Sequence, residues 1–334
     1  MIVFPKTLLE AQASEGTIRA GGTELQERRR LPGMGGDLVD LRDTAGLDSL
    51  RFAADGTLRI GAGRRIAEVG SNAEIQAAYP GFAEAAGGLA TPQIRAVATM
   101  AGNLLQRTRC WYFRAPQTGD RCFKRGGNMC SARSGDHLFH ACFDLGSCVS
   151  VHPSTLGMAM LAYDGLVEVA PGGMRSVAEL LGDGSDASAD NTLRPGEVVT
   201  ALVLPAPQAG EHSAYFRAIS RARSEWPLVE VLARLVVDGG VIKEAAIALG
   251  GVAPVPVRAS VAEAKLVGKA PDAAAFQTAA EAATVGSAPL PMTGYKLELI
   301  VGSVLEALER AAKRDPVVLP APIHKLPRSS EKTP

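Results

Sequence analysis

Every cysteine of this 334-residue chain lies between positions 110 and 148, in a stretch that is also rich in glycine and arginine. A folded core has no reason to collect all its thiols in such a loop, whereas a metal centre needs several thiolate donors at one point. We therefore interpret the stretch as a loop that holds a metal or a cluster. The five thiols are Cys110, Cys122, Cys130, Cys142 and Cys148.

Composition narrows the class of protein. With 46% hydrophobic residues the chain can form two or three small domains that each bury a core. Its 35 basic and 35 acidic residues cancel, so no overall field favours nucleic acid or a membrane surface. Residues 1–30 resemble no secretory or twin-arginine leader, and no apolar run approaches the roughly 20 residues of a membrane span. An odd number of thiols fits a reducing or metal-loaded setting better than a disulfide framework.

The first part of the chain alternates short strands, glycine turns and brief helices. Strands are predicted at 17–19, 39–41 and 58–61, which favours an α/β or α+β core. Further on, two apolar runs flank Asp238-Gly239-Gly240, which predicts a hairpin. Apolar residues recur on one helical face from Leu297 to Leu308, so we expect an amphipathic helix over 295–314.

Two glycine turns are candidate ligand sites. The first, at 20–24, has the sequence Ala-Gly-Gly-Thr-Glu and directly follows a predicted strand. Successive glycines let several backbone N–H groups point to one side and surround a pyrophosphate, but an ordinary tight turn is the commoner meaning of this spacing. It is neither a Walker A loop nor a Rossmann fingerprint. The second turn, Ala101-Gly102-Asn103, names no nucleotide by itself either.

Six segments taken together resemble the flavin-binding subunit of the xanthine dehydrogenase and aldehyde oxidase family of molybdenum hydroxylases. Their order and spacing match over nearly the whole chain. The segments are 19–25, 86–106, 152–154, 195–197, 248–254 and 294–299.

The resemblance implies an α+β fold, with a two-part FAD-binding domain of the vanillyl-alcohol-oxidase type followed by a smaller α+β domain. The expected boundaries are 1–56 and 57–208 for the two FAD-binding parts, with an iron–sulfur loop at about 107–150, then 209–314 for the C-terminal domain and 315–334 for an extended tail. The residues implied to contact FAD are Ala20, Gly21, Gly22, Thr23, Glu24, Met100, Gly102, Asn103, Gln106, His152, Ser154 and Thr155.

The thiols place the chain in a subdivision of the family. Residues 106–114 resemble the bacterial aldehyde oxidase type, which carries an inserted loop with a 4Fe-4S cluster, and this implies Cys110, Cys122, Cys130 and Cys148 as its ligands. Cys142 lies in an apolar run, where a small buried thiol is the common outcome.

Charge supports a cluster, because seven basic residues against one acid, Asp120, lie between 107 and 133 and would stabilise an anionic centre. Zinc is the alternative metal, although no Cys-x-x-Cys pair is present.

Five other residues are harder to interpret. The family usually has an acidic residue after His-Pro-Ser, where this chain has Thr155. Trp226 either stacks near the flavin or fills a domain junction. For Lys296 a solvated position is the simplest reading, and His137 and His140 are expected in surface or loop roles.

By resemblance, substrate hydroxylation occurs on partner chains. The expected complex contains a molybdenum cofactor subunit and a 2Fe-2S subunit, which passes electrons to FAD on this chain and then to an external acceptor. This makes the chain an oxidoreductase subunit, of an aldehyde oxidase or dehydrogenase complex. The competing hypothesis is a zinc-stapled assembly scaffold without a redox role. A cytoplasmic location is the default, and export on a partner's signal would make the complex periplasmic.

Overall fold

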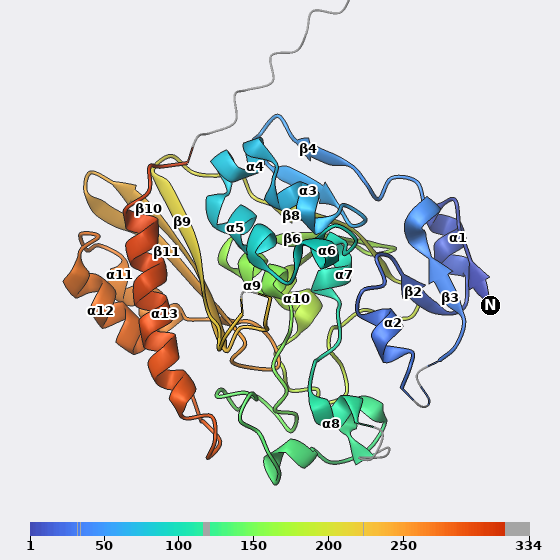
Figure 1. Ribbon diagram of the computed structural model, residues 1–334. Coiled ribbons are helices and arrows are strands. Elements are labelled where there is room, and N and C mark those ends of the chain that lie inside the picture. The colour runs from blue at the N-terminus through green and yellow to red at the C-terminus, as the bar shows by residue number, and fades with distance from the viewer. Residues whose placement is uncertain (32, 34, 116–120, 223, 318–334) are drawn as a thin grey trace, which may run out of the picture.

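A computed structural model of the protein describes residues 1–317 except positions 32, 34, 116–120 and 223. Asp120, His324 and most of the predicted tail lie outside the described residues. The described chain forms three β-sheets with helices packed on them, and the segment between α7 and α9, green in Figure 1, extends away from the sheets.

The first sheet is parallel, with the strand order β1-β3-β2. Its strands are Ile2–Val3, Thr17–Arg19 and Leu38–Asp40. The strand predicted at 17–19 is confirmed. The one predicted at 39–41 lies one residue earlier, because the Asp40 side chain accepts a hydrogen bond from Arg42 N and starts a 3-10 turn at Leu41.

The second sheet has five antiparallel strands in the order β4-β5-β8-β6-β7. Strand β5 occupies the predicted residues 58–61. The strands are Leu50–Phe52 (β4), Leu58–Gly61 (β5), Leu166–Ala170 (β6), Gly173–Ser176 (β7) and Val198–Leu204 (β8).

Short helices surround these two sheets, except α8, which belongs to the segment that extends away from them (Figure 1). Among them α9 buries almost every side chain in the larger hydrophobic core, and α5 contributes Phe82, Ala83, Ala85 and Ala86 to it. The helices are α1 (Leu8–Ala13), α2 (Leu25–Arg28), α3 (Ile66–Gly70), α4 (Ala73–Ala78), α5 (Pro80–Gly88), α6 (Pro92–Arg95), α7 (Met100–Leu104), α8 (Trp111–Arg114), α9 (Thr155–Ala162) and α10 (Val177–Leu181).

The third sheet, which we call the C-terminal sheet, is antiparallel in the order β12-β11-β10-β9. The predicted hairpin is confirmed, since β10 and β11 pair across Gly239 and Gly240, both with positive φ. The strands are β9 (Glu211–Ala218), β10 (Val229–Asp238), β11 (Val241–Gly250) and β12 (Val257–Arg258).

Three helices cover this sheet and enclose the second core (Figure 1). They are α11 (Ser260–Leu266), α12 (Ala273–Ala282) and α13 (Tyr295–Ala312). The predicted amphipathic helix is therefore confirmed, although α13 ends two residues before the expected Arg314. Its buried face includes Ile300, Val304 and Leu308.

The fold is α+β, as expected. None of the helices among the described residues is long and apolar enough to cross a membrane.

Candidate functional site

The first glycine turn packs against the segment 97–98 that leads into α7, and the second glycine motif, 101–103, is part of α7 rather than a turn. A Cβ atom on Gly21 would come within 2.3 Å of Val97 O, just before α7, so only glycine permits this approach. Gly22 has φ +69, in the left-handed region that favours glycine. The turn at 20–23 thus leads from β2 into α2 while it packs on the segment that leads into α7. Thr23 stands at the end of this turn, beside Glu24.

The predicted residues on α7 and around α9 form one hydrogen-bonded group. Asn103 Oδ1 accepts hydrogen bonds from Ser154 Oγ at 2.8 Å and from Leu156 N at 3.3 Å. Ser154 also caps α9 by accepting from Gly157 N. Gln106 Nε2 donates to Pro153 O at 3.1 Å. Because Asn103 and Ser154 bind each other, α7 fixes the His-Pro-Ser turn that precedes α9.

Other predicted FAD contacts have different surroundings. Met100 is fully buried in the core, and its N–H donates to Arg64 O. Gly102 donates its N–H to Thr99, which caps α7. Glu24 forms ion pairs with Arg28 at 3.2 Å and with Arg114 at 2.9 Å, so its carboxylate joins α2 to α8. The flavin roles of these residues, and of Ala20, stay predictions.

A cavity of about 300 Å³ opens beside the His-Pro-Ser turn. That volume is at the small end of the range for ligand sites. His152 is one of its wall residues; Nε2 of this ring is buried and has no hydrogen-bond partner in the described part of the chain, while Nδ1 accepts from Ser154 N. Burial lowers the pKa of His152 to about 4, so the ring is neutral and can pair with a ligand. An orphaned buried nitrogen and a glycine-only close approach both fit a bound cofactor.

Aromatic and cationic groups border the same cavity. Trp226 is half exposed there, and the Arg109 guanidinium lies 4.7 Å from the centre of its ring. Trp226 therefore does not fill a buried domain junction. Cys110, Trp111 and His140 also contribute to the wall, so the thiol-rich loop and the cavity share a boundary.

Glu230, on β10, is a wall residue that the sequence analysis missed. Its carboxylate is 2% exposed, and its Oε2 accepts hydrogen bonds from Thr155 Oγ1 at 2.9 Å and from Tyr215 OH at 2.7 Å. Burial raises the pKa of Glu230 above its ordinary value. A glutamate that interrupts the apolar run 229–236 was the available signal.

Four of the five thiols lie close enough to affect one another's pKa values. Cys110 interacts with Cys122 and Cys148, and Cys122 interacts with Cys148. A hydrogen bond joins Cys130 to Cys148; it lowers the pKa of Cys130 and raises that of Cys148. Burial raises the pKa of Cys110 to about 11. These four are the residues that the resemblance implied as ligands.

Cys142 lies apart from this group. It is fully buried in the core of the C-terminal sheet, and its backbone binds Val252 O and Ala288 N. Its electrostatic neighbour is Lys296, which is 1% exposed and donates to Gly251 O at 2.6 Å. The simple reading of Lys296 as solvated is wrong, because the start of α13 packs against the thiol-rich loop.

No three Cys, His, Asp or Glu side chains in the described residues are close enough to hold a single metal ion. Within the described residues a hydrogen bond joins Cys110 Sγ and His140 Nε2, at 3.2 Å. His140 is 3% exposed and His137 is 6% exposed, so the expectation of surface or loop roles missed their burial.

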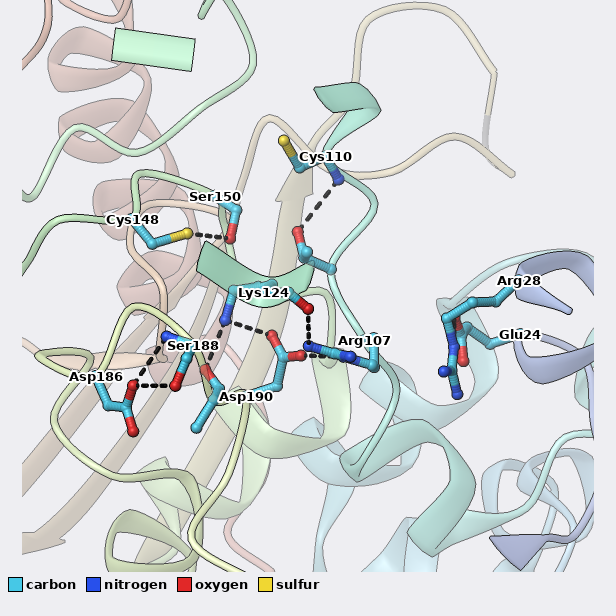
Figure 2. Close-up of polar contacts among 12 residues, drawn as sticks. Glu24, Arg28, Arg107, Cys110, Lys124, Cys148, Ser150, Asp186, Ser188 and Asp190 are labelled. Carbon is cyan, nitrogen blue, oxygen red and sulfur yellow. Dashed lines mark hydrogen bonds and ion pairs between the residues drawn. The ribbon is translucent and has the colours of Figure 1, made fainter. Parts of the chain in front are cut away.

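Most cations of the thiol-rich loop have acidic partners from elsewhere in the chain. Lys124 Nζ lies 2.7 Å from Asp190 Oδ1, and Arg107 Nε lies 2.6 Å from Asp190 Oδ2, as Figure 2 shows. Further pairs are Arg109 with Glu27, Arg114 with Glu24 and Glu27, and Arg133 with Asp144. The excess positive charge inferred from the sequence is therefore largely compensated by these partners. The pKa values of Cys122 and Cys148 are raised, the first mainly by burial and the second mainly by its hydrogen bond to Cys130, and Lys124 only partly offsets both shifts.

Comparison with known families and proteins agrees with this geometry. Residues 6–207 match the family described as the FAD binding domain in molybdopterin dehydrogenase, and residues 214–311 match the CO dehydrogenase flavoprotein C-terminal domain. The aldehyde oxidoreductase FAD-binding subunit PaoB of Escherichia coli K12 is 36% identical over 257 residues, which cover 74% of this chain and 78% of PaoB. The xanthine dehydrogenase FAD-binding subunit of Escherichia coli O157:H7 is 26% identical, over 76% of this chain and 73% of that protein.

Solved structures show the same fold. A chain of the carbon monoxide dehydrogenase from Hydrogenophaga pseudoflava superimposes with a TM-score of 0.70 at 26% identity, over 93% of this chain and 96% of that one. Reconstituted CO dehydrogenase from Oligotropha carboxidovorans gives a TM-score of 0.72 at 24% identity, over 94% and 98%. The chain belongs to the FAD-binding subunits of the xanthine dehydrogenase and aldehyde oxidase family, and is thus an oxidoreductase flavoprotein subunit.

Proposed function

We propose that this chain is the electron-transfer flavoprotein subunit of an aldehyde-oxidising molybdenum hydroxylase complex. It would receive electrons from 2Fe-2S centres on one partner, while a molybdenum cofactor subunit oxidises the aldehyde, and it would pass them to an external acceptor. FAD, when bound, accepts electrons singly and releases them as a pair. The likeness to PaoB, over about three quarters of both chains, carries the choice of an aldehyde rather than a purine.

The residues of the site suggest which segments of this chain bind which parts of FAD. The turn at 20–23 would bind the pyrophosphate through backbone N–H groups. The cavity beside His152, Trp226 and Glu230 would take the flavin ring, whose planar faces suit an aromatic and a guanidinium neighbour. His152 Nε2 would then gain the partner that it lacks.

The proposal also includes a 4Fe-4S cluster on Cys110, Cys122, Cys130 and Cys148. These four thiols interact with one another, and Cys142 interacts with Lys296 instead. Each thiolate of such a cluster binds a different iron atom, so the ligands lie farther apart than around a single ion. The four thiols are spaced too widely to hold a single ion. This spacing is therefore compatible with the cluster and less compatible with a zinc site.

Single substitutions test the ligand set. Cys122→Ser should abolish the broad visible iron–sulfur absorbance of this subunit, because serine replaces a thiolate ligand. Cys142→Ala is the matched control: it should keep the absorbance and cost about 1 kcal/mol of stability for the lost buried sulfur. Iron loss from the Cys142→Ala protein but not from a Cys148→Ser protein would show that the ligand assignment is wrong.

Rapid mixing tests the electron-transfer role. When the purified complex is mixed with an aldehyde without oxygen, the flavin absorbance should bleach at least as fast as the complex turns over. Adding the acceptor should restore it. Turnover that continues while the flavin stays oxidised would contradict the proposed function.

A further inference from the structure

The wall of the cavity contains a carboxylate that no part of the proposed function uses. Glu230 lies on β10, is almost completely buried, and borders the cavity together with His152 and Trp226. Its pKa is raised by burial, the opposite of the effect expected for a carboxylate in a strong ion pair. A buried carboxylate is costly unless it is well hydrogen-bonded or has a function.

Two hydroxyl groups fix this carboxylate. Thr155 Oγ1 and Tyr215 OH both donate to Oε2, at 2.9 Å and 2.7 Å, and they come from two different elements, α9 and β9. Tyr215 is itself buried, and burial together with the neighbouring Glu230 raises its pKa, so it remains a donor. The carboxylate therefore has one defined position, with both donors on the same oxygen atom.

The hydrogen bond between Thr155 and Glu230 is informative because of the residue type at position 155. Thr155 directly follows His-Pro-Ser, where the sequence resemblance implies an acidic side chain. In this chain the threonine instead donates its hydroxyl proton to a glutamate from the neighbouring strand. The carboxyl group at this corner of the cavity thus comes from β10 instead of α9.

We propose that Glu230 borders the flavin ring and lowers its reduction potential, with Thr155 and Tyr215 as positioning residues. This inference rests on the proposed placement of the ring in the cavity. Reduction adds negative charge to a flavin, and a carboxylate nearby opposes that charge more strongly in a buried cavity than in water. A lower potential makes the reduced flavin a better donor to the external acceptor.

Glu230→Gln tests the proposal through the flavin potential, measured by spectroelectrochemical titration of the purified complex. Glutamine keeps the shape and removes the charge, so the potential should shift upward. Glu211→Gln is the matched control. Glu211, on β9, is also buried with a raised pKa, but it pairs with Arg234 at 3.2 Å and is not a wall residue of the cavity, so its substitution should leave the potential unchanged.

Two further variants keep the test decisive if Glu230→Gln folds poorly. Tyr215→Phe retains the carboxylate but removes one donor, which weakens its charged form, so the potential should shift upward by a smaller amount. The exchange Thr155→Asp with Glu230→Thr moves the charge back to α9 and should return the potential towards that of the unaltered complex.

Three results separate the possible conclusions. An upward shift in Glu230→Gln or Tyr215→Phe, reversed by the exchange and absent from Glu211→Gln, supports the proposal. Full flavin content with an unchanged potential in Glu230→Gln and Tyr215→Phe overturns it and leaves Glu230 with a structural role. An unaltered complex that lacks flavin or keeps it oxidised with aldehyde refutes the proposed function itself.

Discussion

Lys296 places an ammonium group inside the protein, where its hydrogen bonds go to the carbonyl oxygens of Gly251 and Phe139. Burial lowers the pKa of Lys296 to about 8, whereas an unfolded lysine titrates near 10.4. Between these two pH values the unfolded chain holds a proton that the folded chain has released. The free energy of unfolding therefore rises with pH over this window.

This predicts a difference between the unaltered protein and Lys296→Met that depends on pH. Between about pH 8 and 10.4, the free energy of unfolding of the unaltered protein should rise by on the order of 3 kcal/mol relative to that of the variant. Urea unfolding at several pH values measures the effect. The exposed Lys313→Met is the control and should show a flat difference. Parallel stability curves for the unaltered and Lys296→Met proteins would contradict the predicted titration.

Gly21 allows a test of the close approach between the turn at 20–23 and the segment that leads into α7. In Gly21→Ala the new Cβ would meet Val97 O, so the two segments must separate. We expect stability to fall by about 1–3 kcal/mol and flavin to be retained less well during gel filtration. Gly302→Ala, on α13 with open space around it, is the control and should be neutral or slightly stabilising. Normal flavin retention by Gly21→Ala would show that this turn does not hold the cofactor.

Sequence reasoning found the site residues that stand in motifs and missed those that do not. Asn103 and Ser154 lie in matched segments, and the structure joins them. Glu230, His140 and Lys296 are single polar residues whose burial depends on chain segments far away in sequence. A local pattern cannot show which distant carbonyl or hydroxyl group will satisfy such a side chain.

Among the elements, the thiol-rich loop depends on contacts outside itself. Its 3-10 turns at Phe123–Arg125 and Ser131–Arg133 are only one turn long and supply few backbone hydrogen bonds. Lys124 adds contacts with the segment before β8. Its Nζ forms an ion pair with Asp190, as Figure 2 shows, and donates a hydrogen bond to Ala189 O. Ion pairs to Asp190 therefore fasten the loop to the segment before β8.

Lys124→Met tests this attachment. Removing a buried cation leaves Asp190 with Arg107 as its remaining ion-pair partner among the described residues, so the free energy of unfolding should fall by about 3 kcal/mol. Breaking the exposed pair of Lys313 and Glu309 with Lys313→Met should cost no more than about 0.5 kcal/mol. Equal small losses for both variants, in chemical denaturation at neutral pH, would mean that the buried pair does not stabilise the loop.

The regular elements could be predicted because their signals are local. Asp238-Gly239-Gly240 specifies a hairpin, and the apolar face of α13 repeats over five turns. The thiol-rich loop has no repeating pattern. The sequence analysis overestimated its net positive charge, because its acidic partners Glu24, Glu27 and Asp190 lie far from it in sequence. The domain boundaries at 56/57 and 208/209 stay predictions.

At the scale of the whole molecule, the proposed cofactors would share one wall. Cys110 and His140 of the loop border the cavity that also touches His152, Trp226 and Glu230. The C-terminal sheet contributes β10 to this cavity and packs its core against Cys142 of the loop. Three parts of the chain that are separate in sequence therefore meet where the flavin ring and the cluster are proposed to lie.

The most direct test is a combined flavin and iron analysis of the complex, with and without the thiols. The unaltered complex should contain one FAD per copy of this chain and four more iron atoms per copy than a complex carrying Cys110→Ser and Cys122→Ser. Partner 2Fe-2S centres cancel in this difference. Equal iron contents, zinc in place of the extra iron, or an unaltered complex without FAD would contradict the account.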